Sequence, residues 1–149
     1  ILMEVARDEA ALRDLTRAWF ERSTAFEVLK EAARQGHQVL LTTDHGSILC
    51  QHPTTVFARK DVTANLRYKF GQDLRAEVPS TAFNTHDEKD LRLPGGRLGM
   101  SYLIALEDYF FVYPTKLREY QARYRNAFLH GGISPEEMIV PVASLKPRP

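Results

Sequence analysis

The sequence predicts an α/β fold in which a mostly parallel central sheet is flanked by helices, with a small peripheral β-hairpin region. Two observations favour this class. Apolar residues at helical spacing in the N-terminal segments stop at Gly36, a typical helix terminator. The short apolar run Val39-Leu40-Leu41 follows at once. A helix, a glycine and a continuous apolar strand in this order are typical of parallel sheets, whose strands are buried on both faces.

Length and composition limit the classes that apply. The chain has 149 residues, enough for one domain with a substantial core, and its net charge of +1 gives no general argument for nucleic acid or anionic membranes as partners. The single cysteine, Cys50, rules out an internal disulfide and fits a reducing compartment. No apolar run approaches the roughly 20 residues of a membrane helix, and we expect no signal peptide. We therefore expect a cytoplasmic protein without membrane insertion.

The N-terminal third is predicted to contain two helices and a buried strand. A helix is expected over about residues 4–21, and because it begins without a capping residue we expect the chain to be part of something longer. A second helix starts at a cap, Ser23 or Thr24, and ends before Gly36. The strand over residues 37–43 follows it.

The rest of the chain is predicted to form short strands, a loop and two helix starts. A break is expected at residues 52–55 and a loop at residues 79–99, both rich in turn-forming residues. A helix over about 116–128 leads to His130, and Ser134 with Glu137 is a capping box for another helix start. Strands are expected at residues 47–50, 56–58, 102–106, 109–113 and 138–145, with a tight turn between the third and the fourth.

Two glycine-flanked histidines are the candidate functional residues. Asp44-His45 and His130 each lie at the end of a regular element and are each followed directly by glycine. This arrangement places both imidazoles at the loop edge of a sheet, where ligands bind. Asp and His together suit a divalent metal, zinc above all, so Asp44, His45 and His130 are the predicted metal ligands. Each pattern by itself also fits an ordinary polar turn.

Residues 59–75 mix cations with aromatic side chains. Arg59, Arg67 and Lys69 are candidates for holding a substrate phosphate, and Tyr68 for stacking on a base. The alternative is a solvated face of a peripheral hairpin.

Several of these motifs resemble a known family. Residues 41–46 (LTTDHG) and 130–134 (HGGIS), followed by 136–141 (EEMIVP), look like the C-terminal part of a PglZ domain, a branch of the alkaline phosphatase superfamily. Residues 15–21 (LTRAWFE) and 65–69 (NLRYK) are similar to PglZ domains fused to response regulators, such as the one that controls type IX secretion in Bacteroidota. The resemblance implies that residues 1–149 are the C-terminal part of one alkaline-phosphatase-like three-layer sandwich, whose N-terminal half is absent.

The resemblance also implies an activity. Such a domain is a two-zinc phosphohydrolase or phosphodiesterase, and Asp44 and His45 match its adjacent ligands on the metal that carries the nucleophile. His130 matches the late histidine on the other metal. The nucleophile and the remaining ligands have no counterpart in this chain, so we expect the parent protein to be an enzyme and this part alone to be inactive. The alternative is a non-catalytic regulatory or partner-binding PglZ module, in type IX secretion signalling or phage defence.

The partners that this interpretation implies are of three kinds. One is a phosphate ester, such as a nucleotide or oligonucleotide, as the substrate. The others are the upstream half of the same domain and a receiver domain.

Overall fold

Two helices at the N-terminus begin where short polar side chains cap them. In the computed structural model, which describes residues 5–58, 63–85 and 100–148, α2 (Glu9–Phe20) starts after Asp8 and α3 (Thr24–Arg34) after Ser23. Each cap side chain accepts a backbone N–H of the first turn. The second predicted helix is confirmed, whereas the first is interrupted at residues 6–8, and α2 begins only after its cap Asp8. Within the described ranges, no helix combines the length and apolar character needed to cross a membrane.

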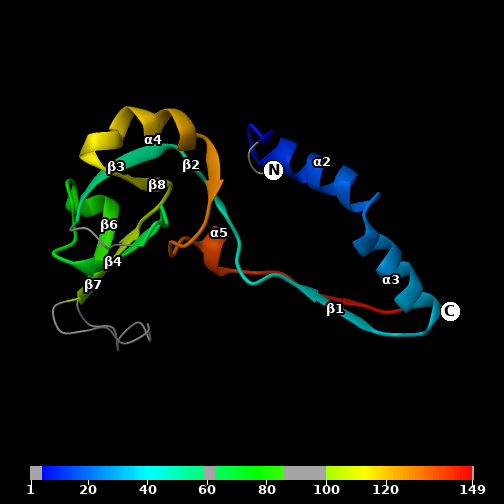
Figure 1. The fold of residues 1–149 in the computed structure, drawn as a ribbon. Helices are drawn as coiled ribbons and strands as arrows, with labels where there is room; N and C mark the ends of the chain where they lie inside the picture. The colour runs from blue at the N-terminus through cyan, green and yellow to red at the C-terminus, as the bar shows by residue number, and fades with distance from the viewer. Residues whose placement is uncertain (1–4, 59–62, 86–99, 149) are drawn as a thin grey trace.

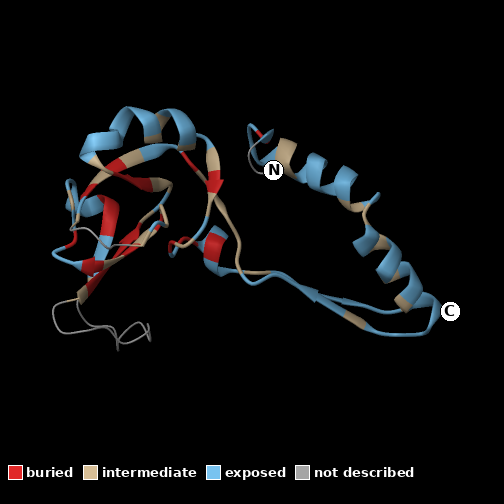
Figure 2. Cartoon of the chain, in the orientation of Figure 1, coloured by how far each residue is buried: buried red, intermediate tan, exposed pale blue. Residues whose placement is uncertain are grey.

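The apolar strand after these helices is exposed, not buried. β1 (Val39–Thr42) pairs antiparallel with β10 (Val142–Leu145), and the two form a sheet of their own. Leu40 is 68% exposed and Leu41 46% exposed. Figures 1 and 2 show this ribbon, with α2 and α3, extending away from the β-rich part of the chain. The prediction of a buried, parallel strand is therefore wrong, because none of the described elements covers either face of the ribbon.

The core is built from two three-stranded sheets, and only one strand pair among the described residues is parallel. In one sheet β7 pairs antiparallel with both neighbours; in the other β3 pairs parallel with β8 and antiparallel with β5. The mostly parallel central sheet that the sequence predicts is thus not present in the described ranges. The strands of these sheets are β3 (His52–Phe57), β4 (Tyr68–Gln72), β5 (Arg75–Ala76), β6 (Ala82–Thr85), β7 (Met100–Ala105) and β8 (Tyr109–Val112).

Several local predictions need correction. The break expected at 52–55 is part of β3, where Pro53 is tolerated because β5 pairs only with the far end of that strand. The loop expected at 79–99 contains the 3₁₀ turn η1 (Pro79–Thr81) and β6, and its residues 86–99 lie outside the described part. The strands near 102–106 and 109–113 are confirmed, but they belong to different sheets.

The helix predicted at 116–128 is shorter than expected. The 3₁₀ turn η2 (Pro114–Lys116) precedes α4 (Leu117–Tyr124), which ends early because the backbone of Arg125 is extended, and Asn126 then adopts a left-handed φ of 62°. Residues that would have continued the helix form β9 (Ala127–Leu129), which pairs antiparallel with β2 (Ile48–Cys50). The last elements are α5 (Pro135–Met138) and β10. A strand was expected over residues 138–145, and β10 occupies only the second half of that range.

Buried apolar side chains occupy the β-rich part of the molecule (Figure 2). One cluster centres on Val56, Leu103 and Phe111, between the two three-stranded sheets. A second contains Cys50 and Phe110, against which side chains of α4 pack. Neither α2 nor α3 has a buried residue. The core therefore supports the end of the β2–β9 pair, while the helices and the ribbon carry exposed apolar surface.

Candidate functional site

The structure brings His45 and His130 into contact. His45 precedes β2 and His130 follows β9, and Ile48 of β2 lies opposite Leu129 of β9. Because the two strands are antiparallel, the chain before one and the chain after the other emerge at the same end. The two imidazole rings stack there, with centroids 3.8 Å apart and an interplanar angle of 13°.

Asp44 is turned toward the same imidazole pair. Its Oδ1 accepts the backbone N–H of His45 at 3.1 Å and lies 3.7 Å from His45 Nε2. On the other side of the ring, His45 Nδ1 lies 2.8 Å from the carbonyl oxygen of Gly46, which can only accept a hydrogen bond. Nδ1 therefore donates a proton to this carbonyl, and Nε2 is the ring nitrogen that faces the exposed carboxylate of Asp44.

The donor types at this site fit zinc, but their number does not. Imidazole nitrogen and carboxylate oxygen are ordinary zinc ligands, and a closed site uses four. Across the described ranges, no group of three or more His, Cys, Asp or Glu side chains is close enough together to hold a metal ion. The described part of the chain therefore does not complete a zinc site.

Of the residues predicted to contact substrate, the three that the structure describes are buried or half-buried. Arg67 is fully buried and ion-paired with Glu137, and Lys69 is buried with its Nζ donating to the carbonyl oxygen of Thr63 at 2.8 Å. Burial lowers the pKa of Lys69 to about 8. Tyr68 is half-buried in β4, and Arg59 lies outside the described residues. The two buried cations face the interior, so their placement lends no support to a phosphate-binding role.

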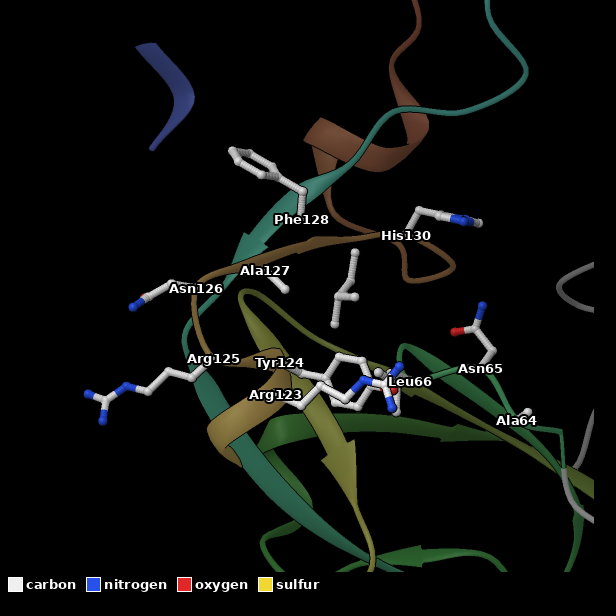
Figure 3. A pocket seen from close by; sticks show the side chains of 11 residues that line it. Ala64, Asn65, Leu66, Arg123, Tyr124, Arg125, Asn126, Ala127, Phe128 and His130 are labelled. Atoms are coloured by element: carbon white, nitrogen blue, oxygen red, sulfur yellow. The ribbon is translucent and has the colours of Figure 1, made fainter. Parts of the chain in front are cut away.

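A cavity of about 910 Å³ lies beside His130 (Figure 3). In that view Asn65 and His130 lie at one end of it and Arg125 and Asn126 at the other. Tyr124 also lines it, and Arg67, Tyr68 and Lys69 do not. A cavity of this size accommodates a nucleotide-sized ligand.

Sequence reasoning missed the long-range contacts of Glu137 beside the histidine pair. Its carboxylate accepts the N–H groups of Gly132 at 2.8 Å and Ser134 at 3.2 Å, and it pairs with Arg67. Burial by itself raises the pKa of this carboxyl, but the hydrogen bonds from Arg67 and Gly132 and the charge of Arg67 outweigh it, so the net shift is downward. The capping-box pattern correctly identifies the acid, whereas the partner 70 residues away leaves no local signal.

A second Asp–His pair was also missed. His52 Nδ1 lies 2.9 Å from Asp108 Oδ1 and 3.0 Å from Oδ2, where β3 begins beside the turn before β8. The two residues are 56 positions apart, so only the parallel pairing of β3 and β8 brings them together.

Comparison with known protein families gives a match over nearly the whole chain. A family model described as the BREX system PglZ alkaline phosphatase-like domain matches residues 2–145. No curated protein matches the chain significantly.

Proposed function

The chain belongs to the PglZ family of alkaline phosphatase-like domains, and we propose on this premise that it carries part of the metal site of a phosphohydrolase. Membership of this family implies a phosphohydrolase activity or a role in BREX phage defence. The observation that carries the proposal is the stacked pair His45–His130 with the carboxylate of Asp44 beside it. These are the three residues that the sequence predicted as zinc ligands.

In this proposal each of the three residues has a defined role. Asp44 supplies negative charge, and His45 presents Nε2 as a neutral imidazole ligand because its Nδ1 proton is held by Gly46. His130 offers a second imidazole. A bound divalent metal would stabilise charge on a phosphate ester and its attacking oxygen. Two zinc ions need more donors than these, so we place the nucleophile and the remaining ligands in an upstream half of the same domain.

Exposed apolar side chains support an additional part of the domain as a partner. Val28 on α3, Leu40 on β1 and Val142 on β10 are each at least 60% exposed. Apolar surface of this kind is ordinarily covered by another protein segment. We assign that position to the upstream half, which would cover the ribbon and complete the site at its end.

The cavity beside His130 is the proposed place for the substrate. It adjoins a candidate ligand and is lined by two cationic side chains, Arg123 and Arg125, and by Tyr124. This combination suits a phosphate ester that carries an aromatic base, such as a nucleotide or an oligonucleotide. The similarity of residues 15–21 and 65–69 to response-regulator PglZ domains further favours an output domain controlled by a receiver domain.

The test is a pair of histidine variants in the protein that contains this chain. We expect His130→Ala to remove bound zinc and to lower hydrolysis of a chromogenic phosphodiester by at least about 100-fold, the loss expected when a metal catalyst is removed. The matched control is His52→Ala, which removes a histidine that also faces a carboxylate but lies outside the site. Full activity and full zinc content in His130→Ala would overturn the assignment.

A second candidate is a non-catalytic partner-binding module. It is favoured by the same exposed apolar ribbon, together with the lack of a three-donor group among the residues placed by the structure. Under this alternative, partner binding in phage defence or secretion signalling is unchanged after zinc is removed with a chelator. Loss of partner binding on zinc removal contradicts it.

A further inference from the structure

A buried ion pair lies directly against the two histidine loops. Arg67 Nε donates to Glu137 Oε1 at 3.0 Å and Nη2 to Oε2 at 2.6 Å, a bidentate arrangement in which both side chains are almost fully buried. Neither residue lines the cavity beside His130. The pair therefore has no direct route to a substrate.

Glu137 holds both histidine loops at once. Its carboxylate accepts the N–H groups of Gly132 and Ser134, which follow His130. Its backbone carbonyl accepts the N–H of Gly46 at 2.9 Å, directly after His45. One residue thus fixes the backbone next to each of the two stacked rings.

Arg67 ties this arrangement to the core. Its backbone carbonyl accepts the N–H of Ala105 at 2.7 Å, and its Nη1 donates to the carbonyl oxygens of Leu106 and Tyr109. These partners belong to β7, to β8 and to the turn between them. The two main sheets therefore fix the position of Glu137 through Arg67, and with it the position of both histidine loops.

The contacts are tight enough to need glycine on both loops. A Cβ on Gly132 would lie 2.6 Å from Glu137 Oε2 and would overlap the Arg67 guanidinium. A Cβ on Gly46 would overlap the backbone carbonyl of Glu136. Neither position has a positive φ that would itself call for glycine. Gly46 and Gly132 are thus explained by close approach to this ion pair and its helix, whereas Gly131, directly after His130, has a φ of 108° that itself favours glycine.

We propose that Arg67 and Glu137 are a positioning pair that fixes the stacked geometry of His45 and His130. Stability alone is a poor reason for such a pair, since replacing a buried ion pair by apolar residues of similar volume is often neutral or stabilising. An apolar pair, however, offers no acceptor to the N–H groups of Gly132 and Ser134. Those acceptors are what hold the His130 loop against the His45 loop.

Histidine ring NMR signals test this directly on the 149-residue chain, without metal or substrate. Rings stacked at 3.8 Å lie in each other's ring current, so the ring protons of His45 and His130 are displaced upfield. His45→Ala and His130→Ala supply the unstacked reference for the remaining ring. We expect the double variant Arg67→Met, Glu137→Leu to keep its far-UV circular dichroism and to lose the upfield displacement.

Two further variants keep the outcome decisive. Glu137→Gln retains the side-chain volume if the double variant does not fold, and it is expected to lose the displacement at least in part, because an amide cannot accept from Arg67, Gly132 and Ser134 as a carboxylate does. The matched control Lys69→Met removes another buried cation and should leave both rings at wild-type positions. Wild-type ring positions in folded Arg67→Met, Glu137→Leu and in Glu137→Gln would overturn the proposal.

A metal readout separates this inference from the proposed function. If the protein that contains this chain binds zinc, the Arg67 and Glu137 variants should weaken binding by about 10- to 100-fold, the usual cost of disturbing residues that orient ligands. If no zinc binds, the proposed function fails, while the NMR result still decides whether the pair positions the rings.

Discussion

Replacing Gly46 by alanine should destabilise the chain around the histidine loops by about 2–4 kcal/mol. The added methyl group would overlap the carbonyl oxygen of Glu136, and overpacking of this kind costs about 1–3 kcal/mol. Moving the backbone away also breaks the 2.9 Å hydrogen bond from Gly46 N–H to the Glu137 carbonyl, worth about 1 kcal/mol. Gly46 has no positive φ, so the destabilisation begins with steric overlap and not with backbone strain.

Cys50 provides the assay. Its thiol is completely buried, and burial raises its pKa to about 12, so a thiol reagent reacts only after the structure around β2 opens. The labelling rate under native conditions then reports the free energy of that opening. With about 1.4 kcal/mol per factor of ten, Gly46→Ala should label about 30- to 700-fold faster than the wild type.

The control for this prediction is Gly36→Ala. Gly36 has a φ of 75°, and no atom lies within 4 Å of the place that an added methyl group would take, so alanine there meets backbone strain of about 1 kcal/mol but no overlap. Gly36 follows α3, which lies far from β2, the strand that contains Cys50 (Figure 1), so its substitution should hardly change the labelling rate. Equal labelling of Gly46→Ala and the wild type would refute the tight packing of the two loops.

Three further predictions concern the core and its buried charges. The lowered pKa of Glu137 means that its stabilising contribution is complete above about pH 4.5 and is lost as pH falls through its folded-state pKa. In Glu137→Gln, the free energy of unfolding should therefore fall less steeply with decreasing pH below 4.5 than in the wild type. Lys69 has a pKa of about 8 in the folded state against 10.5 when unfolded, so the folded state binds fewer protons and the free energy of unfolding should rise between pH 8 and 10.5. Lys69→Met should raise the free energy of unfolding at pH 7, measured with urea, by roughly 1–3 kcal/mol. Leu103→Ala should cost about 2–5 kcal/mol by the same measurement, whereas Leu40→Ala, on the exposed ribbon, should cost almost nothing; similar costs for the two would contradict the placement of the core.

Local signals predicted most of the individual elements. The helix starts at Ser23 and Ser134, the helix end before Gly36 and the strands around residues 102–106 and 109–113 depend on neighbours within a few positions, and the structure has them all. The proximity of His45 and His130 was also predictable, because each follows the same format of element, histidine and glycine.

Pairing and burial were not predictable in the same way. An apolar run such as Val39-Leu40-Leu41 indicates a strand, but whether it is buried depends on what covers it, and in the described structure its partner is β10 alone. The charge and position of Arg67 suggested a phosphate contact. Its true surroundings are set by Glu137, which lies 70 residues away and leaves no trace in the neighbouring sequence.

The ribbon of β1 and β10 has a consequence for handling the isolated chain. A two-stranded sheet is at best marginally stable in water, and each strand has one edge to which no strand is added in the described structure. Such edges recruit strands from neighbouring molecules, particularly where side chains like Leu40 and Val142 are exposed. Self-association through sheet extension is therefore the main solubility hazard of this chain, and a charged residue at position 40 is the simplest protection against it.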